Sequence, residues 1–233
     1  RFRGPGGCGS GGGDAGAGAP VDGPEGTRQD RIAVSLGRLL GPDFPSEIGL
    51  AVSGGGDSMA MLHLAAGWAR AWGVGARVVT VDHGLRPESA AEAALVADEA
   101  RGLGLRHDTL RWGGWDGRGN LPDAARQARL DLIGGWRGDL RHVLFAHTMD
   151  DQAETFLMRL RRGSGVEGLS AMAERRAMPG GWGVIRAMLG MRRAELRHYL
   201  AVLRIPFVDD PTNDDTAYDR VRMRGLLDGL EAE

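Results

Sequence analysis

The chain has 233 residues, 42% hydrophobic and 26% charged, which is typical of a soluble globular protein of one ordinary domain or slightly more. Its formal net charge of -2 argues against indiscriminate nucleic-acid binding, and no run approaches the roughly 20 apolar residues of a membrane span. The single cysteine, Cys8, excludes a disulfide framework and a Cys-x-x-Cys metal site, so a cytoplasmic enzyme is expected. The sequence contains no lysine, which excludes a Schiff-base lysine and a P-loop lysine.

The chain opens with a glycine-rich leader, residues 1–29, that carries almost no apolar side chains. Such a segment cannot offset its own ordering entropy, so we expect it to be disordered. Because the first residue is Arg1 rather than Met, we also expect the sequence to be a fragment or to have a mis-set start. From Asp30 the apolar spacing predicts a short helix, which Gly41-Pro42 ends.

Strands and helices are then expected to alternate. The predicted strands are 48–52, 77–81, 107–111, 142–146 and a short one near 184–186. Helices are expected from 57 on, and at about 87–103, 122–136 and 150–162, with a further helix after the last strand. Repeated strand–helix units predict an α/β fold, a doubly wound (Rossmann-like) parallel sheet of about five strands with helices on both faces.

Helical spacing of apolar residues predicts which side of each helix is buried. The expected stripes are Met61, Leu64, Ala65, Trp68 and Trp72; Ala153, Phe156, Leu157 and Leu160; and Leu196, Tyr199, Leu200 and Leu203. A flexible loop at 163–169 could close over the site, 207–213 is a turn-rich loop, and the chain from Thr216 onward is expected to be helical.

The most informative stretch is the turn after the first strand of the predicted sheet. Its residues are Ser53, Gly54, Gly55, Gly56, Asp57 and Ser58. Successive N–H groups in a glycine turn, followed by a helix N-terminus, form a nest that binds phosphate. Asp57 would repel that phosphate, by roughly 4 kcal/mol for two unit charges at 4 Å, unless a cation such as Mg²⁺ lies between them. A plain turn capping a helix is the alternative interpretation.

Two more polar groups follow predicted strands. Asp82 and His83 come after the second strand, and the stretch from His147 to Asp151 comes after the fourth. In open parallel sheets, ligands bind outside the carboxyl ends of the strands, so these groups and the glycine turn should share one rim. Each has an ordinary alternative, because His147 and Asp151 could cap a helix and Asp82-His83 could be turn residues.

Arginine is unevenly distributed along the chain. Residues 159–224 carry more arginine than acidic residues, so this basic C-terminal part could face a polyanion. A solvated arginine-rich surface explains the same pattern equally well. Arg126 and Arg129, three apart on a predicted helix, could likewise form an exposed face.

Taken together, these motifs resemble a known family. The glycine turn resembles the SGGxDS pyrophosphate loop of the N-type ATP pyrophosphatases, the PP-loop superfamily. Further along, the chain is similar to the tRNA(Ile)-lysidine synthase family within that group. The motifs that carry the similarity are Val81–Arg86, Ala146–Thr155, Arg162–Gly165 and Asp209–Asn213.

The resemblance implies a PP-loop ATP pyrophosphatase domain at 30–224, with 225–233 as the start of a C-terminal helix or linker and the later domains of the family absent. It implies a ligase that adenylates C2 of the wobble cytidine of tRNA(Ile) with a CAU anticodon, using ATP and Mg²⁺. Free lysine then displaces AMP to form lysidine. Partners would be that tRNA and lysine, with no membrane; a homodimer is compatible with the sequence, which does not fix the oligomeric state.

By the same resemblance each candidate residue receives a role. Asp57, Arg126, His147 and Asp151 match catalytic positions, with Asp57 also holding the metal. The nucleotide would contact Ser53, Gly54, Gly55, Gly56, Asp57, Ser58, Asp82 and His83. Substrate or tRNA contacts would come from Arg162, Arg186, Arg193 and Arg222.

Two alternatives stay open. Another PP-loop adenylating enzyme, such as a tRNA base thiolase or an amidotransferase-like enzyme, would use the same loop, although the lack of paired cysteines argues against a thiolase. A nucleotide-binding module without catalysis would not need Arg126, His147 and Asp151.

Overall fold

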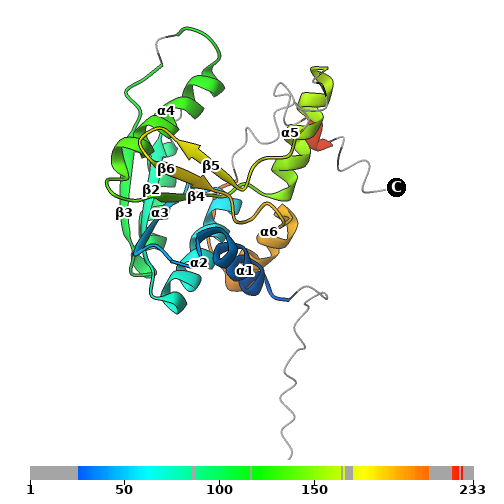
Figure 1. Ribbon diagram of the computed structural model, residues 1–233. Helices are drawn as coiled ribbons and strands as arrows, with labels where there is room; N and C mark the ends of the chain where they lie inside the picture. The colour runs from blue at the N-terminus through cyan, green and yellow to red at the C-terminus, as the bar shows by residue number, and fades with distance from the viewer. Residues whose placement is uncertain are drawn as a thin grey trace, which may run out of the picture.

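The computed structural model describes residues 26–84, 88–115, 117–163, 165, 170–209, 222–225 and 227 (Figure 1). The helices are α1 (Arg28–Leu40), α2 (Gly56–Trp72), α3 (Ser89–Gly102), α4 (Leu121–Trp136), α5 (Met149–Arg161) and α6 (Arg193–Leu203). The strands are β1 (Glu47–Ala51), β2 (Gly75–Asp82), β3 (Arg106–Arg111), β4 (His142–Phe145), β5 (Arg175–Met178) and β6 (Trp182–Ile185). None of these helices is long and apolar enough to cross a membrane.

The strands form one six-stranded sheet in the order β3-β2-β1-β4-β6-β5. All neighbouring pairs are parallel except β5 and β6. The chain winds outward from β1 to β3 and then returns to place β4 on the other side of β1, so β1 and β4 flank the point where the strand order reverses. The predicted doubly wound fold is confirmed, and the antiparallel edge strand β5 is an addition that was not anticipated.

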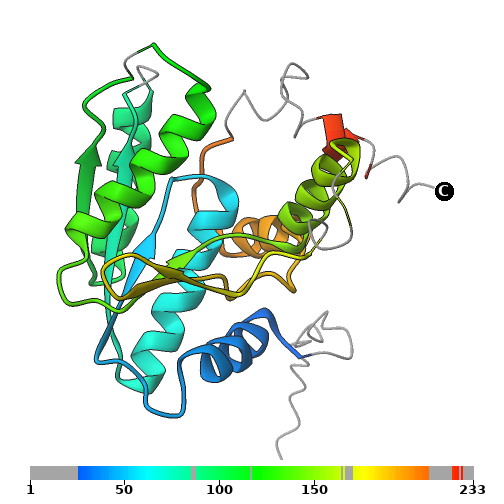
Figure 2. The same cartoon turned by 45° about the horizontal axis from the view of Figure 1, so that its top comes forward.

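Helices cover both faces of the sheet (Figure 2). The larger core lies on one face and takes buried side chains from α1, α2, α3 and α6. The smaller core lies on the other face, where Leu130 and Ile133 of α4 pack against strand residues that include Val143 and Val184. We call these the α2 face and the α4 face. Alternate strand residues point to opposite faces, which is why neighbours in one strand belong to different cores.

Local sequence accounts for the helix ends. Helix α1 begins two residues before the predicted Asp30, because the Thr27 hydroxyl accepts a hydrogen bond from the Asp30 N–H (3.1 Å) while the Asp30 side chain bonds back to Thr27. Helix α2 ends at Gly73, whose φ of 67° is the left-handed cap conformation that glycine favours.

Four predicted core positions are wrong. Trp72, Phe156, Leu160 and Leu203 are each 45–55% exposed. Trp72 is the last residue of α2 and contacts the ring of Phe44 at its edge. The fully buried residue of α5 is a glutamate rather than an apolar side chain. Helical spacing indicates that a helix forms but does not establish that a core lies against its apolar side.

Several predicted features lie outside the described residues. These are residues 1–25 of the leader, most of the loop at 163–169, Asp210–Asn213 and the start of the helix expected from Thr216. Residues 222–225 are helical, as expected for that last segment.

Candidate active site

The glycine turn joins β1 to α2 and is held by the side chain of Ser58. The Ser58 hydroxyl accepts a hydrogen bond from the Ser53 N–H (3.1 Å) and donates one to the Gly55 carbonyl (2.8 Å). Gly54 has a φ of 91°, a conformation that side chains rarely adopt. Gly55 is the N-cap residue of α2 and offers no side-chain cap, so an anion could bond to the first N–H groups of the helix.

A distant segment fixes the other side of this turn. The Val208 N–H donates to the Gly54 carbonyl (2.9 Å), and Val208 pairs with Gly55 as an isolated parallel bridge. A Cβ added to Gly56 would meet the Phe207 ring at 3.3 Å, so this position has little room for a side chain. The turn is therefore clamped by residues about 150 positions further along the chain.

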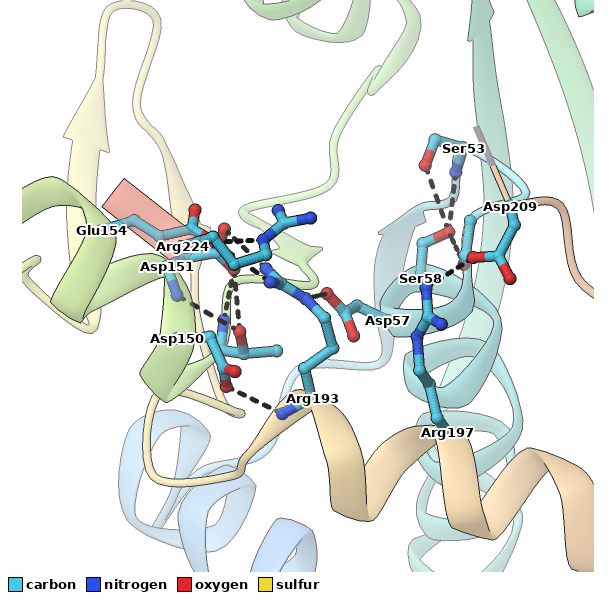
Figure 3. Close-up of polar contacts among 12 residues, drawn as sticks. Ser53, Asp57, Ser58, Asp150, Asp151, Glu154, Arg193, Arg197, Asp209 and Arg224 are labelled. Carbon is cyan, nitrogen blue, oxygen red and sulfur yellow. Dashed lines mark hydrogen bonds and ion pairs between the residues drawn. The ribbon is translucent and has the colours of Figure 1, made fainter. Parts of the chain in front are cut away.

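Asp57 lies in the first turn of α2 and points to Arg193 of α6 (Figure 3). The Arg193 Nε donates to the Asp57 Oδ2 at 3.0 Å, whereas the Asp57 Oδ1 is buried and has no hydrogen-bond partner among the residues that the structure describes. Burial raises the pKa of Asp57; the Arg193 charge opposes this rise, and nearby Asp151 and Asp150 reinforce it. An unbonded buried carboxylate oxygen is costly in a protein interior, and a bound cation would satisfy it.

Arg193 is the centre of a cluster of carboxylates. Besides Asp57 it contacts Glu154 (3.0 Å) and Asp151 (3.6 Å), and its N–H donates to Asp150 (2.8 Å). Burial lowers the pKa of Arg193, whereas the carboxylates of Asp57 and Glu154 raise it by a larger amount. The pKa of Arg193 is therefore above its ordinary value, and the guanidinium is charged. The sequence predicted a substrate or tRNA contact for Arg193, but it did not predict that this side chain lies among carboxylates.

Glu154 was not predicted as a site residue. Its side chain is fully buried, with Oε1 bonded to Arg193 and to the Arg224 Nε (3.1 Å). The available signal was its spacing, because Glu154 is three residues after Asp151 and therefore on the same side of α5. Glutamate is rarely buried unless paired, and here two arginines pair it.

At the end of β4, Asp151 and His147 have different local roles. Thr148 is the N-cap residue of α5 and forms a capping box in which the Asp151 Oδ2 accepts from the Thr148 N–H (2.8 Å). Asp151 therefore takes part in capping the helix, as the alternative interpretation of the sequence proposed, whereas the N-cap residue is Thr148 and not His147. The His147 ring stacks on Phe145 with centroids 6.2 Å apart, so it lies on the α4 side of the rim.

The third group of the rim follows β2. The Asp82 Oδ1 accepts from the Gly84 N–H (2.8 Å), and hydrogen bonds from Ser89 and Gly84 lower the pKa of Asp82. The ring of His83 meets Trp112 edge-on, and burial, followed by the Arg129 charge, lowers its pKa, so the ring is neutral at pH 7. The turn alternative thus describes Asp82, while His83 is a half-buried neutral ring.

These groups surround one cavity of about 710 Å³, a size common among small-molecule sites. Of the predicted residues, the lining includes Ser53, Gly55, Gly56, Asp57, Ser58, Asp82, His83, His147, Asp151 and Arg193, together with Arg129. Gly54, Arg126, Arg162, Arg186 and Arg222 are not among the lining residues. Within the described ranges no group of three or more His, Cys, Asp or Glu side chains is arranged to hold a metal ion by itself.

A family model described as the PP-loop domain matches residues 28–229. The chain belongs to the PP-loop domain family. Membership supports ATP as the nucleotide.

Two curated relatives are similar to this PP-loop domain over most of its length. The tRNA(Ile)-lysidine synthase of Ruegeria pomeroyi is 53% identical over 188 residues, which cover 80% of this chain and 45% of that protein. The tRNA(Ile)-lysidine synthase of a Bradyrhizobium species is 48% identical over 218 residues, 89% of this chain and 60% of that protein. The chain therefore spans about half the length of these relatives.

A solved structure has the same fold. The U34-tRNA thiolase NcsA from Methanococcus maripaludis aligns with a TM-score of 0.71, covering 87% of this chain and 73% of that one. Because the two sequences are only 15% identical, the match concerns the PP-loop fold alone.

Proposed function

We propose that this chain is the ATP-using ligase part of a tRNA(Ile)-lysidine synthase. ATP would transfer AMP to the C2 oxygen of the wobble cytidine of tRNA(Ile) with a CAU anticodon and release pyrophosphate. The amine of free lysine would then attack C2 and displace AMP, leaving lysidine. We assign the adenylating domain to residues 30–224 and the reaction to the cytoplasm. The curated relatives that carry this name, at 53% and 48% identity, support the proposal.

One observation carries the proposal: a carboxylate, a histidine and a glycine phosphate turn from three strand ends surround a single cavity. A nucleotide-binding module needs only the turn. Transfer of AMP needs neutralisation of phosphate charge at one end and proton transfer near the acceptor at the other. The cavity has Asp57 and Ser58 on the α2 side, and His147 on the α4 side.

The fit of Mg²⁺ rests on the buried and unbonded Oδ1 of Asp57. Mg²⁺ usually binds one or two protein carboxylates and completes its shell with water and substrate phosphates, so the absence of a three-residue cage among the described residues is compatible with it. Asp57 would hold the ion by Oδ1 while Oδ2 stays on Arg193. The ion would supply positive charge that offsets the negative charge of the pyrophosphate group.

The second step needs a proton acceptor. With a reference pKa near 10.4, only about one lysine amine in 2,500 is neutral at pH 7. The carboxylate of Asp151 already accepts from the Thr148 N–H and hydroxyl and faces Arg193 at 3.6 Å. We therefore assign the proton acceptor to His147 and an orienting role to Asp151.

The decisive experiment follows two labels. The chain is incubated with Mg²⁺, the CAU-anticodon tRNA(Ile), ATP labelled at the α-phosphate and labelled lysine. We expect lysine label in the RNA and release of pyrophosphate, and, without lysine, AMP label in the RNA. A tRNA(Ile) with a GAU anticodon is the control and should acquire neither label. Absence of both labels from the CAU tRNA, with ATP intact, would overturn the proposal.

A further inference from the structure

Three arginines, Arg126, Arg176 and Arg186, lie on the α4 face of the sheet, close enough for the charges of Arg176 and Arg126 to act on Arg186. Arg176 in β5 pairs with Val184 of β6, which belongs to the smaller core. Arg186 is two residues after Val184, so the strand alternation carries it to the same face. Arg126 of α4 is one helical turn before Leu130 and shares its side of that helix.

This group has no counter-charge among the residues that the structure describes. Elsewhere arginines form ion pairs with acids, as Arg77 does with Glu47 and Arg31 with Glu195, but none of the three takes part in an ion pair within the described ranges. Arg186 is only 7% exposed; its Nη1 donates to the Ala173 carbonyl (2.6 Å), and its Nε is buried without a hydrogen bond.

The three charges also act on one another. Burial lowers the pKa of Arg186, and the positive charges of Arg176 and Arg126 lower it further. Three like charges, one of them nearly buried, are an unfavourable arrangement in the absence of an anion. An arrangement of this kind persists in functional sites, where a ligand offsets its cost.

The position of the cluster indicates which anion it would take. None of the three arginines lines the cavity, but Arg186 directly follows β6. On the same face lie Phe145, in the neighbouring strand β4, and His147, just past the end of β4, and both line the cavity. An RNA whose base enters the cavity near His147 would bring its own backbone alongside. Arginine is the side chain best suited to phosphate, because its planar fork can donate two parallel hydrogen bonds.

We propose that Arg126, Arg176 and Arg186 form a binding site for a backbone phosphate of the RNA whose base is modified in the adjacent cavity. The inference rests on the proposed function for the identity of the RNA, but RNA binding can be measured without any catalysis. A free phosphate or the ATP phosphates would be the competing source of the anion.

The test compares two neighbouring arginines of β5. Arg176→Gln removes a charge from the cluster, and Arg175→Gln removes an equal charge from the opposite face of the same strand. Both side chains are exposed, so both variants should fold, which a thermal melt confirms. Binding of fluorescent tRNA(Ile) is measured by anisotropy at several salt concentrations, and binding of a fluorescent ATP analogue is measured in parallel.

We expect Arg176→Gln to weaken tRNA binding on the order of fivefold and to reduce the slope of log K against log salt by about 1, with the same loss for an unrelated tRNA. Arg175→Gln should leave the slope unchanged, and neither variant should alter ATP binding. An unchanged slope in Arg176→Gln, equal losses in the two variants, or a loss of ATP binding rather than RNA binding would each overturn the phosphate site. Failure of lysine incorporation alone would reject the proposed function and leave this result standing.

Discussion

Asp57 is the residue at which the stability of the chain and its proposed chemistry conflict. Its side chain is partly buried and shares Arg193 with Asp151 and Glu154, and its buried Oδ1 has no hydrogen-bond partner in the described part of the chain. Burial raises the pKa of this group, so ionisation of Asp57 is less favourable here than in water. A group kept at such a cost is expected where a ligand binds.

Replacing Asp57 by Asn keeps the shape of the side chain and removes its charge. We expect release of pyrophosphate from ATP, with the CAU-anticodon tRNA present, to fall by about 10²-fold or more, because a charge-neutralising contact to the transferred group is lost. The assay is a coupled pyrophosphate measurement. Asp98→Asn, at an exposed pair with Arg101, is the control and should keep full activity. Undiminished release in Asp57→Asn would remove the metal-binding role from this residue.

Glu154 makes a prediction about stability. Glu154→Gln removes the buried negative charge that pairs with Arg193 and Arg224, and we expect a loss of about 3 kcal/mol in the free energy of unfolding. The matched control is Glu174→Gln, whose partner Arg38 is exposed, and it should cost at most about 1 kcal/mol. Urea denaturation measures both. Equal losses would show that the buried cluster contributes no more than a surface pair.

At the scale of single residues, the sequence predicted which strand-end side chains lie at one rim, but it did not predict the partners of those side chains. Asp82, His147 and Asp151 line one cavity with the glycine turn because parallel strands end at one edge. Their chemical roles remain predictions. The pairing of Asp57 with Arg193 could not be predicted, because it depends on how α6 packs on α2, which no local pattern specifies.

At the scale of elements, burial decided what could be predicted. Strand β6 is buried at three of its four positions and its apolar run was recognised, whereas the side chains of β5 are mostly exposed and its two arginines gave no strand signal. The same limit applies to α5, whose apolar spacing is helical although Phe156 and Leu160 face outward. The apolar pattern therefore missed the exposed strand β5, and for α5 it identified the helix but not its buried side.

The glycine turn gives a prediction at this scale. Gly54→Ala places a side chain where φ is 91°, and we expect it to cost about 1–3 kcal/mol of stability and to weaken ATP binding. Gly37→Ala, inside α1 with no atom within 4 Å of the added Cβ, should instead stabilise by about 0.5–1 kcal/mol and leave ATP binding unchanged. Urea denaturation and calorimetric titration of ATP distinguish the two. Similar results for both variants would contradict a conformational requirement at Gly54.

At the scale of the whole molecule, the groups proposed for phosphate binding and those proposed for RNA binding and proton transfer lie on opposite faces of the sheet. The glycine turn leads into α2 and one core, while His147 and the cluster of Arg126, Arg176 and Arg186 lie with α4 on the other. The parallel, doubly wound architecture was predictable from alternation and the crossover rule, but the order of the strands was not. The contacts that join segments far apart in the sequence were not, since they depend on the packing of the complete fold.

The half-buried histidines predict how stability depends on pH. Burial lowers the pKa of His83, His107 and His142, so the unfolded chain, with values near 6.5, binds protons before the folded chain does. Stability from this source is complete above about pH 6.5 and is lost as the pH falls toward the folded values. Asp57, with its raised pKa, acts in the opposite direction.

Urea midpoints at pH 8 and pH 5.5 measure this dependence, and a variant isolates the histidine part. His142→Gln should reduce the fall in stability between the two pH values, whereas His198→Gln, at an exposed position of α6, should not. An identical pH dependence in His142→Gln and the unmodified chain would contradict the assignment.

The bond between Val208 and Gly54 sets an order of events during synthesis of the chain on the ribosome. Residues of the glycine turn leave the ribosome early, but the segment that clamps them is about 150 residues later. At roughly 5–20 residues per second, this interval lasts about 8–30 s. Through that time the nascent chain can pair β1 with β2 and still lack the clamp on its glycine turn, so tight ATP binding should appear only after α6 and Phe207-Val208 have emerged.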